Sequence, residues 1–407
     1  MSARRRVLML ITQLGYGGAE TSFIRLANFL AESMDVTVAL FTADYGNAKK
    51  YAAGHEKLDA SVTLLDTPHR QHHLLRWLRR IWRVRRLKQQ HDATISFLSG
   101  PNAVNVLAGV NRRTIVSLRG SRMFDSAASR RQRVLFQYFL DPIIYALAAR
   151  IVPVSAGLKY EIRKAATPKT LGKVRVIPPF IDSATLALRL QEDAPEAFRA
   201  LKGQPVIVAA GRLAVEKGFH HLIRVVGALS KTHTGIKLLL IGDGPMMAEL
   251  RALCGTHGLA MDDMTADVSS VIFAGYQKNV LPLMALGRVY AMASATEGFP
   301  SVLLEAMIAG VPVVAADTPW GVRTIMCATP PDTADPYPTT RATTVDFGTL
   351  MPRIDAPEYE AVWVNTLAQS LAHVQALSAA IAKRPYDFDL ATVGEKWKHL
   401  LTEFEPR

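Results

Sequence analysis

Short apolar runs alternate with longer segments of helical periodicity along nearly the whole chain. This alternation is typical of βα units, in which helices cover both faces of a parallel sheet. The runs form one set in each half of the 407 residues. The predicted strands are 7–11, 36–41, 61–65, 93–98, 114–118, 151–154 and 174–177 in the first half, then 206–210, 237–241, 271–274, 289–292 and 313–316. The sequence therefore predicts an α/β protein with two separate parallel sheets.

Two consecutive prolines, Pro178 and Pro179, mark the expected boundary between the sheets. Proline holds the residue before it in extended backbone, and a polar stretch follows before the next apolar run. We expect a first domain over 1–178, a second over 179–384, and a helical segment over 385–407 that returns to the first domain. Helices are predicted over 359–383 and 390–404. The Thr- and Pro-rich stretch 327–347 has no periodicity, which predicts a long surface loop.

The net charge of +13 is concentrated in one half of the chain. Residues 1–190 contain 30 Lys and Arg against 12 Asp and Glu, whereas the remainder contains 18 against 23. This asymmetry predicts an acidic partner for the first half and leaves open a phosphate-bearing lipid surface or a nucleic acid. Cys254 and Cys327 are too few for a disulfide framework, so a reducing, cytoplasmic location is expected. No segment has the length and composition of a membrane span.

The carboxyl ends of parallel strands are where open α/β sheets bind ligands, so the turns after the predicted strands are the places to search. The first such turn contains Gly15, Gly17 and Gly18, followed by Glu20 and a helix expected to begin near Thr21. Glycine lets the backbone approach a ligand closely, and a helix start offers unpaired N–H groups to an anion. A simple tight turn explains the same residues, and the spacing is not that of a dinucleotide fingerprint.

Two further turns follow strands in the second half. Gly211 and Arg212 stand after the strand 206–210, with Lys217 five residues later. Two cations and several amides at one strand end suit a diphosphate, although a solvated charged loop is the alternative. Gly242 and Gly244 follow the strand 237–241, where a plain βα connection is a sufficient explanation.

The most informative turn follows the strand 289–292. Glu297 precedes Pro300, which is expected to begin a helix, and Glu305 lies about two helical turns farther on. A carboxylate accepts hydrogen bonds from vicinal hydroxyls, so two carboxylates around a helix start indicate a nucleotide-sugar site, with one for a sugar ring and one for a ribose. A surface carboxylate is the alternative for Glu305, but its neighbours Leu304 and Ala306 are apolar.

These turns, in this order, resemble the motifs of the retaining family 4 glycosyltransferases, which have the GT-B fold of two Rossmann-like domains with parallel sheets facing an interdomain cleft. The resemblance spans nearly the whole chain. Its pieces are Gly17-Gly18-Ala19-Glu20, Gly211-Arg212 with Glu216-Lys217-Gly218, Gly242-Asp243-Gly244-Pro245, and Glu297-Gly298-Phe299-Pro300 through Glu305-Ala306-Met307 to Gly310-Val311-Pro312.

The resemblance implies roles for the matching residues. Arg212 and Lys217 would bind the donor diphosphate, Glu297 the sugar hydroxyls and Glu305 the ribose, so Glu297, Arg212 and Lys217 are the expected catalytic set. The glycine loop at Gly17 would close over the phosphates and the acceptor. The remaining donor contacts expected are Gly18, Gly211, Gly242, Gly244, Gly298, Phe299, Pro300 and Ser301.

Two segments depart from the family pattern. Many members have a histidine after the strand 114–118, where this chain has Arg119-Gly120-Ser121-Arg122. Arg119 or Arg122 is therefore the expected acceptor or phosphate contact, and Glu20, after the first glycine turn, is a further candidate. The stretch 317–323 lacks the acidic residue that usually follows the family's last glycine-rich turn, which predicts an altered donor preference.

The resemblance also implies the chemistry. A sugar would pass from a UDP- or GDP-sugar to a lipid-linked saccharide acceptor of bacterial polysaccharide or lipopolysaccharide synthesis, with retention of anomeric configuration. Charge would build on the departing diphosphate, where Arg212, Lys217 and the helix start at Pro300 would stabilise it without a metal ion or other cofactor.

A basic segment over 70–90 predicts contact with a membrane surface. Apolar residues recur at helical spacing among many arginines, and no acidic residue lies between Asp66 and Asp92. An ordinary core-packing helix explains the leucines but neither the lack of acids nor the two tryptophans. We expect a peripheral contact with the inner face of an anionic membrane, made by Arg76, Trp77, Arg79, Arg80, Trp82 and Arg83.

Two other function classes remain open. An NAD-dependent oxidoreductase needs an acidic residue near the second strand, for which Asp44 is available, and a regular glycine fingerprint, which is absent. A nucleic-acid-binding protein would use the basic half, but no recognised reading motif is present, so no nucleic acid is the expected partner.

Overall fold

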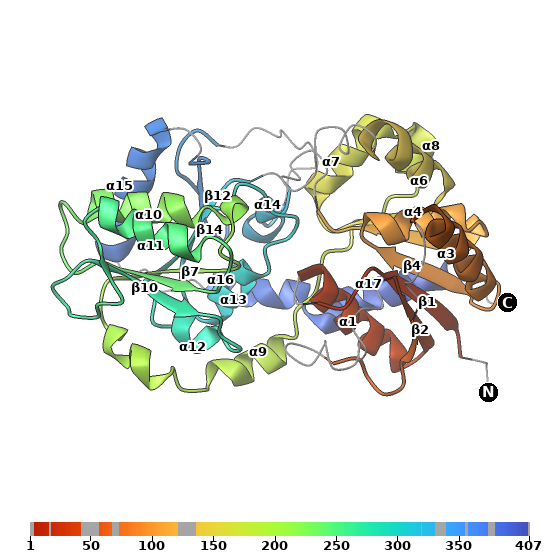
Figure 1. The fold of residues 1–407 in the computed structure, drawn as a ribbon, viewed down its shortest axis with the longest axis horizontal. Helices are drawn as coiled ribbons and strands as arrows, with labels where there is room; N and C mark the ends of the chain where they lie inside the picture. The colour runs from red at the N-terminus through yellow and green to blue at the C-terminus, as the bar shows by residue number, and fades with distance from the viewer. Residues whose placement is uncertain are drawn as a thin grey trace. The chain divides into compact units, whose positions relative to one another are not determined.

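The computed structural model describes residues 4–15, 18–41, 57–66, 73–120, 136–318, 320–329, 339–354, 357–372 and 379–405. The chain divides into two compact units (Figure 1). Unit 1 consists of residues 1–180 and 388–407, and unit 2 consists of residues 181–387. Both are α/β units, as the alternation of apolar runs predicts.

The sheet of unit 1 has the strand order β3-β2-β1-β4-β5-β6, with all pairs parallel. Its strands are β1 (Arg6–Ile11), β2 (Asp35–Leu40), β3 (Thr63–Asp66), β4 (Ala93–Phe97), β5 (Thr114–Leu118) and β6 (Arg150–Pro153). Its helices and short turns are α1 (Gly18–Ala31), α3 (His73–Lys88), α4 (Ser99–Leu107), η2 (Asn111–Arg113), η3 (Phe136–Leu140), α6 (Asp141–Leu147), α7 (Ala156–Ala165), α8 (Pro168–Leu171) and α17 (Leu390–Thr402).

Strand β1 shows why these apolar runs are continuous. Alternate side chains of a strand point to opposite faces of the sheet. Val7 and Met9 pack with α1 and α17, whereas Leu8 and Leu10 pack with α3 and α4. Both faces are covered by helices, so every position of the strand from Val7 to Ile11 is apolar.

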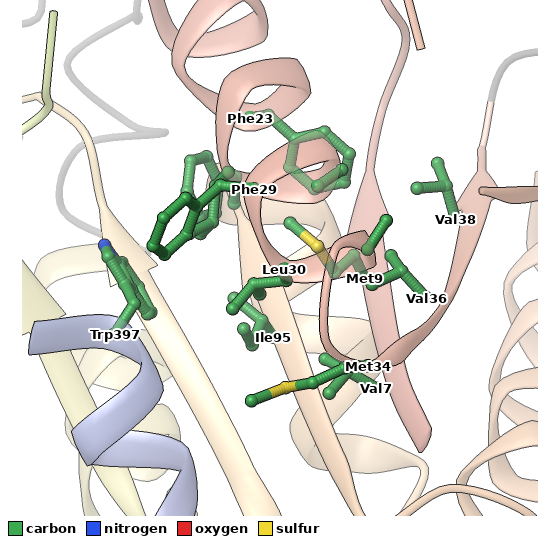
Figure 2. Packing of buried hydrophobic residues seen from close by; sticks show 14 of the residues in the cluster. Val7, Met9, Phe23, Phe29, Leu30, Met34, Val36, Val38, Ile95 and Trp397 are labelled. Carbon is green, nitrogen blue, oxygen red and sulfur yellow. The ribbon is translucent and has the colours of Figure 1, made fainter. Parts of the chain in front are cut away.

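Helix α17 belongs to unit 1 although it follows all of unit 2 in the chain. Trp397 is fully buried among side chains of α1 and the central strands (Figure 2). Its indole ring lies 6.2 Å from the ring of Phe97, which in turn makes an edge-to-face contact with Phe23 at 5.2 Å. A Cβ added at Gly394 would lie 2.5 Å from the Phe29 ring, so the helix backbone itself presses on α1.

The sheet of unit 2 has the order β13-β14-β12-β11-β7-β8-β10-β9, in which β13 pairs antiparallel with β14 and the other pairs are parallel. Its strands are β7 (Val206–Ala210), β8 (Lys237–Ile241), β9 (Ala260–Met261), β10 (Ser270–Gly275), β11 (Val289–Met292), β12 (Val313–Ala316), β13 (Thr343–Val345) and β14 (Gly348–Met351).

The helices of unit 2 cover this sheet and lead back toward α17. They are α9 (Ser183–Leu190), η4 (Glu196–Leu201), η5 (Val215–Lys217), α10 (Phe219–Leu229), α11 (Met247–Thr256), α12 (Leu281–Met284), α13 (Val302–Ile308), α14 (Val322–Met326), η6 (Pro357–Tyr359), α15 (Glu360–Ala372), α16 (Ala379–Lys383) and η7 (Arg384–Phe388). The core of this unit packs α10, α11 and α15 against the central strands.

Two sequence predictions about elements are wrong. Residues 174–177 form no ladder: they run beside β6 with one isolated bridge, from Val174 to Ile151. The stretch 327–347 is not all loop, because β13 lies within it and pairs with the unpredicted β14. The described parts of the predicted helix 359–383 are helical, as α15 and α16, and residues 373–378 between them lie outside the described part.

Candidate active site

The turns after β7 and β8 are packed backbone against backbone. The Gly211 N–H donates to Ile241 O, and the Leu213 N–H donates to Asp243 O, both at 2.9 Å. A Cβ added at Gly242 would lie 1.9 Å from Gly211 O, and one at Gly244 would lie 2.4 Å from Leu213 O. The packing of one turn on the other therefore requires glycine at these positions. This packing fixes the turn that follows β7 against the turn that follows β8.

The turn after β7 is also fixed to the segment that follows β11. Gly218 has a φ of +69°, and a Cβ there would lie 2.1 Å from Ala293 O. The Ala295 N–H donates to Glu216 O at 2.8 Å. Two turns that are about 80 residues apart in the chain thus form one surface at the carboxyl edge of the sheet.

This surface brings Lys217 and Glu297 together. Lys217 Nζ lies 2.6 Å from Glu297 Oε1, with 28% of the lysine side chain and 12% of the glutamate side chain exposed. Arg212 pairs instead with Glu216, its Nη2 lying 2.5 Å from Oε1, and its side chain is 67% exposed. Lys217 and Arg212 are the two cations predicted to bind the donor diphosphate, and we refer to them as the diphosphate clamp. Lys217 is held by Glu297, the predicted sugar-binding carboxylate, whereas Arg212 reaches into solvent.

Glu305 lies on α13, which begins at Val302 and not at Pro300 as predicted. The chain already turns at Pro300, whose carbonyl accepts from the Leu303 N–H at 3.0 Å. The hydroxyl of the fully buried Tyr290, on β11, donates to Ala210 O at 3.2 Å. Burial raises the pKa of Tyr290, and the carboxylates of Glu305 and Glu297 add to that rise. Both carboxylates therefore lie near the same buried hydroxyl.

The segment after β12 supports Glu297 from the other side, a contact that the sequence did not predict. Trp320 has a φ of +90° and forms an isolated parallel bridge with Glu297. A Cβ at Gly321 would lie 2.5 Å from Gly298 O. The buried Asp317 accepts two hydrogen bonds from Arg323, at 2.7 and 2.5 Å. The Asp317–Arg323 pair lies in the stretch that departs from the family pattern. It joins the two ends of the segment that contains Trp320, the residue that bridges to Glu297.

Unit 1 gathers a different group at the carboxyl edge of its own sheet. Arg119 follows β5, donates to Ser22 Oγ on α1, and lies with its guanidinium carbon 4.4 Å from the centre of the Phe97 ring. Burial lowers the pKa of Arg119 to about 9, and the Glu20 carboxylate opposes this. The guanidinium is thus charged at neutral pH. Helix α1 begins at Gly18, three residues before the predicted start. Gly17 and Arg122 lie outside the described residues.

Helix α3 has a face that packs inward and a face that reaches solvent. Val84 and Lys88 are buried, and Arg80 donates to Phe41 O and lies over the Phe41 ring. Arg80, one of the predicted membrane residues, therefore contacts its own unit. Of the other predicted membrane residues, Trp77, Arg79 and Trp82 are exposed, and Arg83 is half-buried. The side chain of Arg76 lies outside the described part. Within that part, no helix combines the length and apolarity needed to cross a bilayer.

Two family models match the chain, one in each unit. The model described as Glycosyltransferase Family 4 matches residues 16–185, and the model described as Glycosyl transferases group 1 matches residues 204–333. Together they cover most of the chain. All of the site residues of unit 2 described above, from Arg212 to Arg323, lie within the second match.

Curated relatives match over parts of their length. The chain is 27% identical over 236 residues to the N-acetylgalactosamine-N,N'-diacetylbacillosaminyl-diphospho-undecaprenol 4-alpha-N-acetylgalactosaminyltransferase of Campylobacter jejuni, covering 57% of this chain and 59% of that protein. It is 36% identical over 110 residues to the lipopolysaccharide core biosynthesis glycosyltransferase LpsE of Rhizobium meliloti, covering 27% and 29%. The chain thus spans less than two thirds of the length of these relatives.

A solved structure matches the whole fold. The crystal structure of Anabaena HepE in complex with UDP and glucose superposes with a TM-score of 0.72 at 19% identity, covering 98% of this chain and 100% of that one. At this identity the match concerns the architecture alone, which is that of two parallel-sheet α/β domains.

Proposed function

Because the chain belongs to the family 4 glycosyltransferases with the GT-B fold, we propose that it transfers a sugar from a nucleoside-diphosphate-sugar to a lipid-linked saccharide, as a step of cell-surface polysaccharide or lipopolysaccharide synthesis. The donor is a UDP- or GDP-sugar, and UDP is the nucleotide bound in the HepE structure. A lipid-linked acceptor is suggested by the diphospho-undecaprenol in the name of the Campylobacter relative.

The observation that carries the proposal is the contact between Lys217 and Glu297 at the carboxyl edge of the unit 2 sheet. In a nucleotide-sugar the sugar and the diphosphate are adjacent, and they require different partners: the sugar hydroxyls donate hydrogen bonds to a carboxylate, and the phosphates bind cations. On this surface the carboxylate of Glu297 and the ammonium group of Lys217 are neighbours. The diphosphate can replace Glu297 as the partner of Lys217, which frees the carboxylate for the sugar hydroxyls.

The proposed transition state separates charge between an oxocarbenium-like sugar and the departing diphosphate. Lys217 and the solvent-reaching Arg212 stabilise the leaving group, and Glu297 stabilises the sugar. Glu305 binds the ribose from the first turn of α13. We propose that the reaction is independent of a metal ion, because the two cations supply the neutralising charge. We also propose that it retains the anomeric configuration, as the family resemblance implies.

A donor screen tests the function. The purified protein is incubated with a panel of UDP- and GDP-sugars, and nucleoside diphosphate release is measured with and without EDTA. We expect release from one nucleotide class, unchanged by EDTA, and an α-anomeric donor should give an α-linked product by NMR. Absence of release from every donor, together with no shift of the melting temperature by any nucleotide, would refute the proposed donor site.

The surface of α3 is proposed to hold unit 1 on an anionic membrane, where a lipid-linked acceptor resides. Arg79, Arg85 and Arg86 are exposed, and Trp77 and Trp82 are exposed beside them. Each basic residue near an anionic bilayer contributes about 1 kcal/mol of attraction. The protein is then cytoplasmic and peripherally bound to the inner face of the membrane.

A further inference from the structure

Unit 1 carries a second exposed apolar surface, on η3 and α6. Four large side chains within ten consecutive residues reach solvent, namely Tyr138, Phe139, Ile143 and Leu147, and the first two are 66% and 62% exposed. Single exposed apolar residues are ordinary, whereas a concentration of them marks an interaction surface. We refer to these four residues as the α6 patch.

The α6 patch is not a result of loose packing. On the inward side of the same helix, Ile144 and Tyr145 are buried in a core with Val116 of β5 and Val106 of α4. Residues 136–140 form a π-helical turn, a rare conformation that is frequent at functional sites. The segment thus has a well-anchored inner face and an apolar outer face.

The α6 patch and the basic residues of α3 lie on helices that share α4 as a neighbour. Helix α4 contacts both α3 and α6, and all three cover the same side of the unit 1 sheet (Figure 1). Leu107, the last residue of α4, is an apolar side chain that is also exposed. On α3, Trp82 is 55% exposed, and the Arg86 guanidinium carbon lies 3.7 Å from the centre of its ring.

Charge is divided between the two elements. The segment 136–147 contains no Lys or Arg, and its one acidic residue, Asp141, is buried. The arginines are on α3, where the sequence has no acidic residue between Asp66 and Asp92. A basic helix and an apolar, aromatic patch on the same side of one sheet complement a bilayer, whose anionic headgroups border hydrocarbon and where Tyr and Trp are the preferred aromatic residues.

We propose that the α6 patch inserts into the boundary between headgroups and acyl chains of an anionic bilayer, while α3 supplies the electrostatic attraction. The inference rests on the proposed function only in that the bilayer is the one that holds the acceptor. It gives α3 and α6 separable roles. The attraction by α3 is weakened by salt, whereas burial of the α6 patch is not.

The test uses vesicles of phosphatidylglycerol and phosphatidylcholine that contain no acceptor. The patch variant carries Tyr138→Gln, Phe139→Gln, Ile143→Gln and Leu147→Gln, and its control carries Leu188→Gln, a 67% exposed leucine on α9 of unit 2. Co-sedimentation is measured at 0.1 M and 1 M salt. We expect the wild type and the control to keep measurable binding at 1 M salt. The patch variant should lose this residual binding and bind at least about tenfold more weakly at 0.1 M salt.

Wild-type levels of binding by a patch variant with native circular dichroism would overturn the proposal. So would a wild-type dimer in solution that the patch variant dissociates without a change in vesicle binding, because the patch would then be a contact between two copies. Donor hydrolysis is measured in parallel without vesicles. Its absence in the wild type would reject the proposed function alone, and unchanged vesicle binding would reject the α6 patch alone.

Discussion

The two units use glycine differently at the carboxyl edges of their sheets. In unit 2, a Cβ at Gly218, Gly242 or Gly321 would lie within 2.5 Å of a backbone oxygen of another turn. In unit 1, a Cβ at Gly18 would meet no atom within 4 Å. The glycines of unit 2 therefore permit turns to interlock into a preformed surface, whereas the position of Gly18 has room for a side chain. The proposed donor surface of unit 2 is thus built from interlocked turns, whereas the position of Gly18 in unit 1 is open.

Replacing Gly242 with alanine should have the largest effect, because it disrupts the interlocked turns of unit 2. Its φ of +144° disfavours any side chain, and the added carbon would overlap Gly211 O. We expect a loss of at least about 3 kcal/mol in the free energy of unfolding of unit 2, from backbone strain and overpacking together. Urea unfolding followed by circular dichroism measures the loss. The matched Gly18→Ala variant should be as stable as the wild type, and equal losses in both variants would contradict the comparison.

Glu297→Gln should lower turnover by about two orders of magnitude or more, because a contact made chiefly in the transition state is lost. The variant should fold, since it removes one ion pair with Lys217 and keeps the size of the side chain. Turnover with saturating donor is the measurement. Glu249→Gln, an exposed carboxylate on α11, is the control and should have wild-type turnover. A fully active Glu297→Gln enzyme would remove the catalytic assignment.

Lys217→Met and Arg212→Gln should each weaken binding of the free nucleoside diphosphate by about 1.5 to 3 kcal/mol, the usual strength of a hydrogen bond to a charged group. Calorimetry measures this, with the exposed Lys231→Met as control. If the units divide donor and acceptor between them, Arg119→Met should leave this affinity unchanged and raise the KM for the acceptor. Unchanged nucleotide affinity in both unit 2 variants would refute the clamp.

The last expected effect is a pH dependence in unit 1. Lys88 is buried, donates to Asn105 O and Thr114 Oγ1 at 2.7 Å, and burial lowers its pKa to about 7. The unfolded chain keeps this proton up to its ordinary pKa of about 10.4. Between these values the unfolded state binds more protons, so the stability of unit 1 should rise with pH above about 7.

Comparison with Lys88→Met isolates this contribution. Unfolding is measured from pH 6 to pH 9 for both proteins, and the wild type should gain stability relative to the variant as the pH rises. The quantity to compare is the free energy of unfolding of the wild type minus that of the variant. If this difference stays constant or falls as the pH rises, Lys88 is charged throughout the range.

Periodicity predicted the two sheets because fully buried parallel strands are continuous apolar runs, and such runs depend only on their own residues. It missed β13 and β14, whose short antiparallel pair has the polar residues Thr343 and Thr344. It assigned a strand to 174–177, which runs extended beside β6 and donates from Arg175 N to Ile151 O but forms no ladder. An extended segment becomes a strand of a sheet only when a neighbouring strand pairs with it along its length. The sequence of the segment alone does not show whether such a neighbour is present.

The candidate site divides in the same way. The positions of Arg212, Lys217 and Glu297 after strands could be predicted from local motifs. The contact of Lys217 with Glu297 could not, because it depends on the packing of two turns far apart in the chain. The same holds for the support of Glu297 by Trp320 and for the burial of Asp317 against Arg323. The oxidoreductase and nucleic-acid alternatives find no support among the relatives, and Asp44 lies outside the described residues.

The position of α17 determines an order of events during synthesis. Residues 388–407 complete the core of unit 1, yet they leave the ribosome after every residue of unit 2. Most of unit 2 therefore leaves the ribosome while Phe97 of unit 1 still lacks the ring of Trp397 that packs against it. Until that helix docks, the first unit exposes an aromatic surface, and it is the unit that needs protection from aggregation although it is made first.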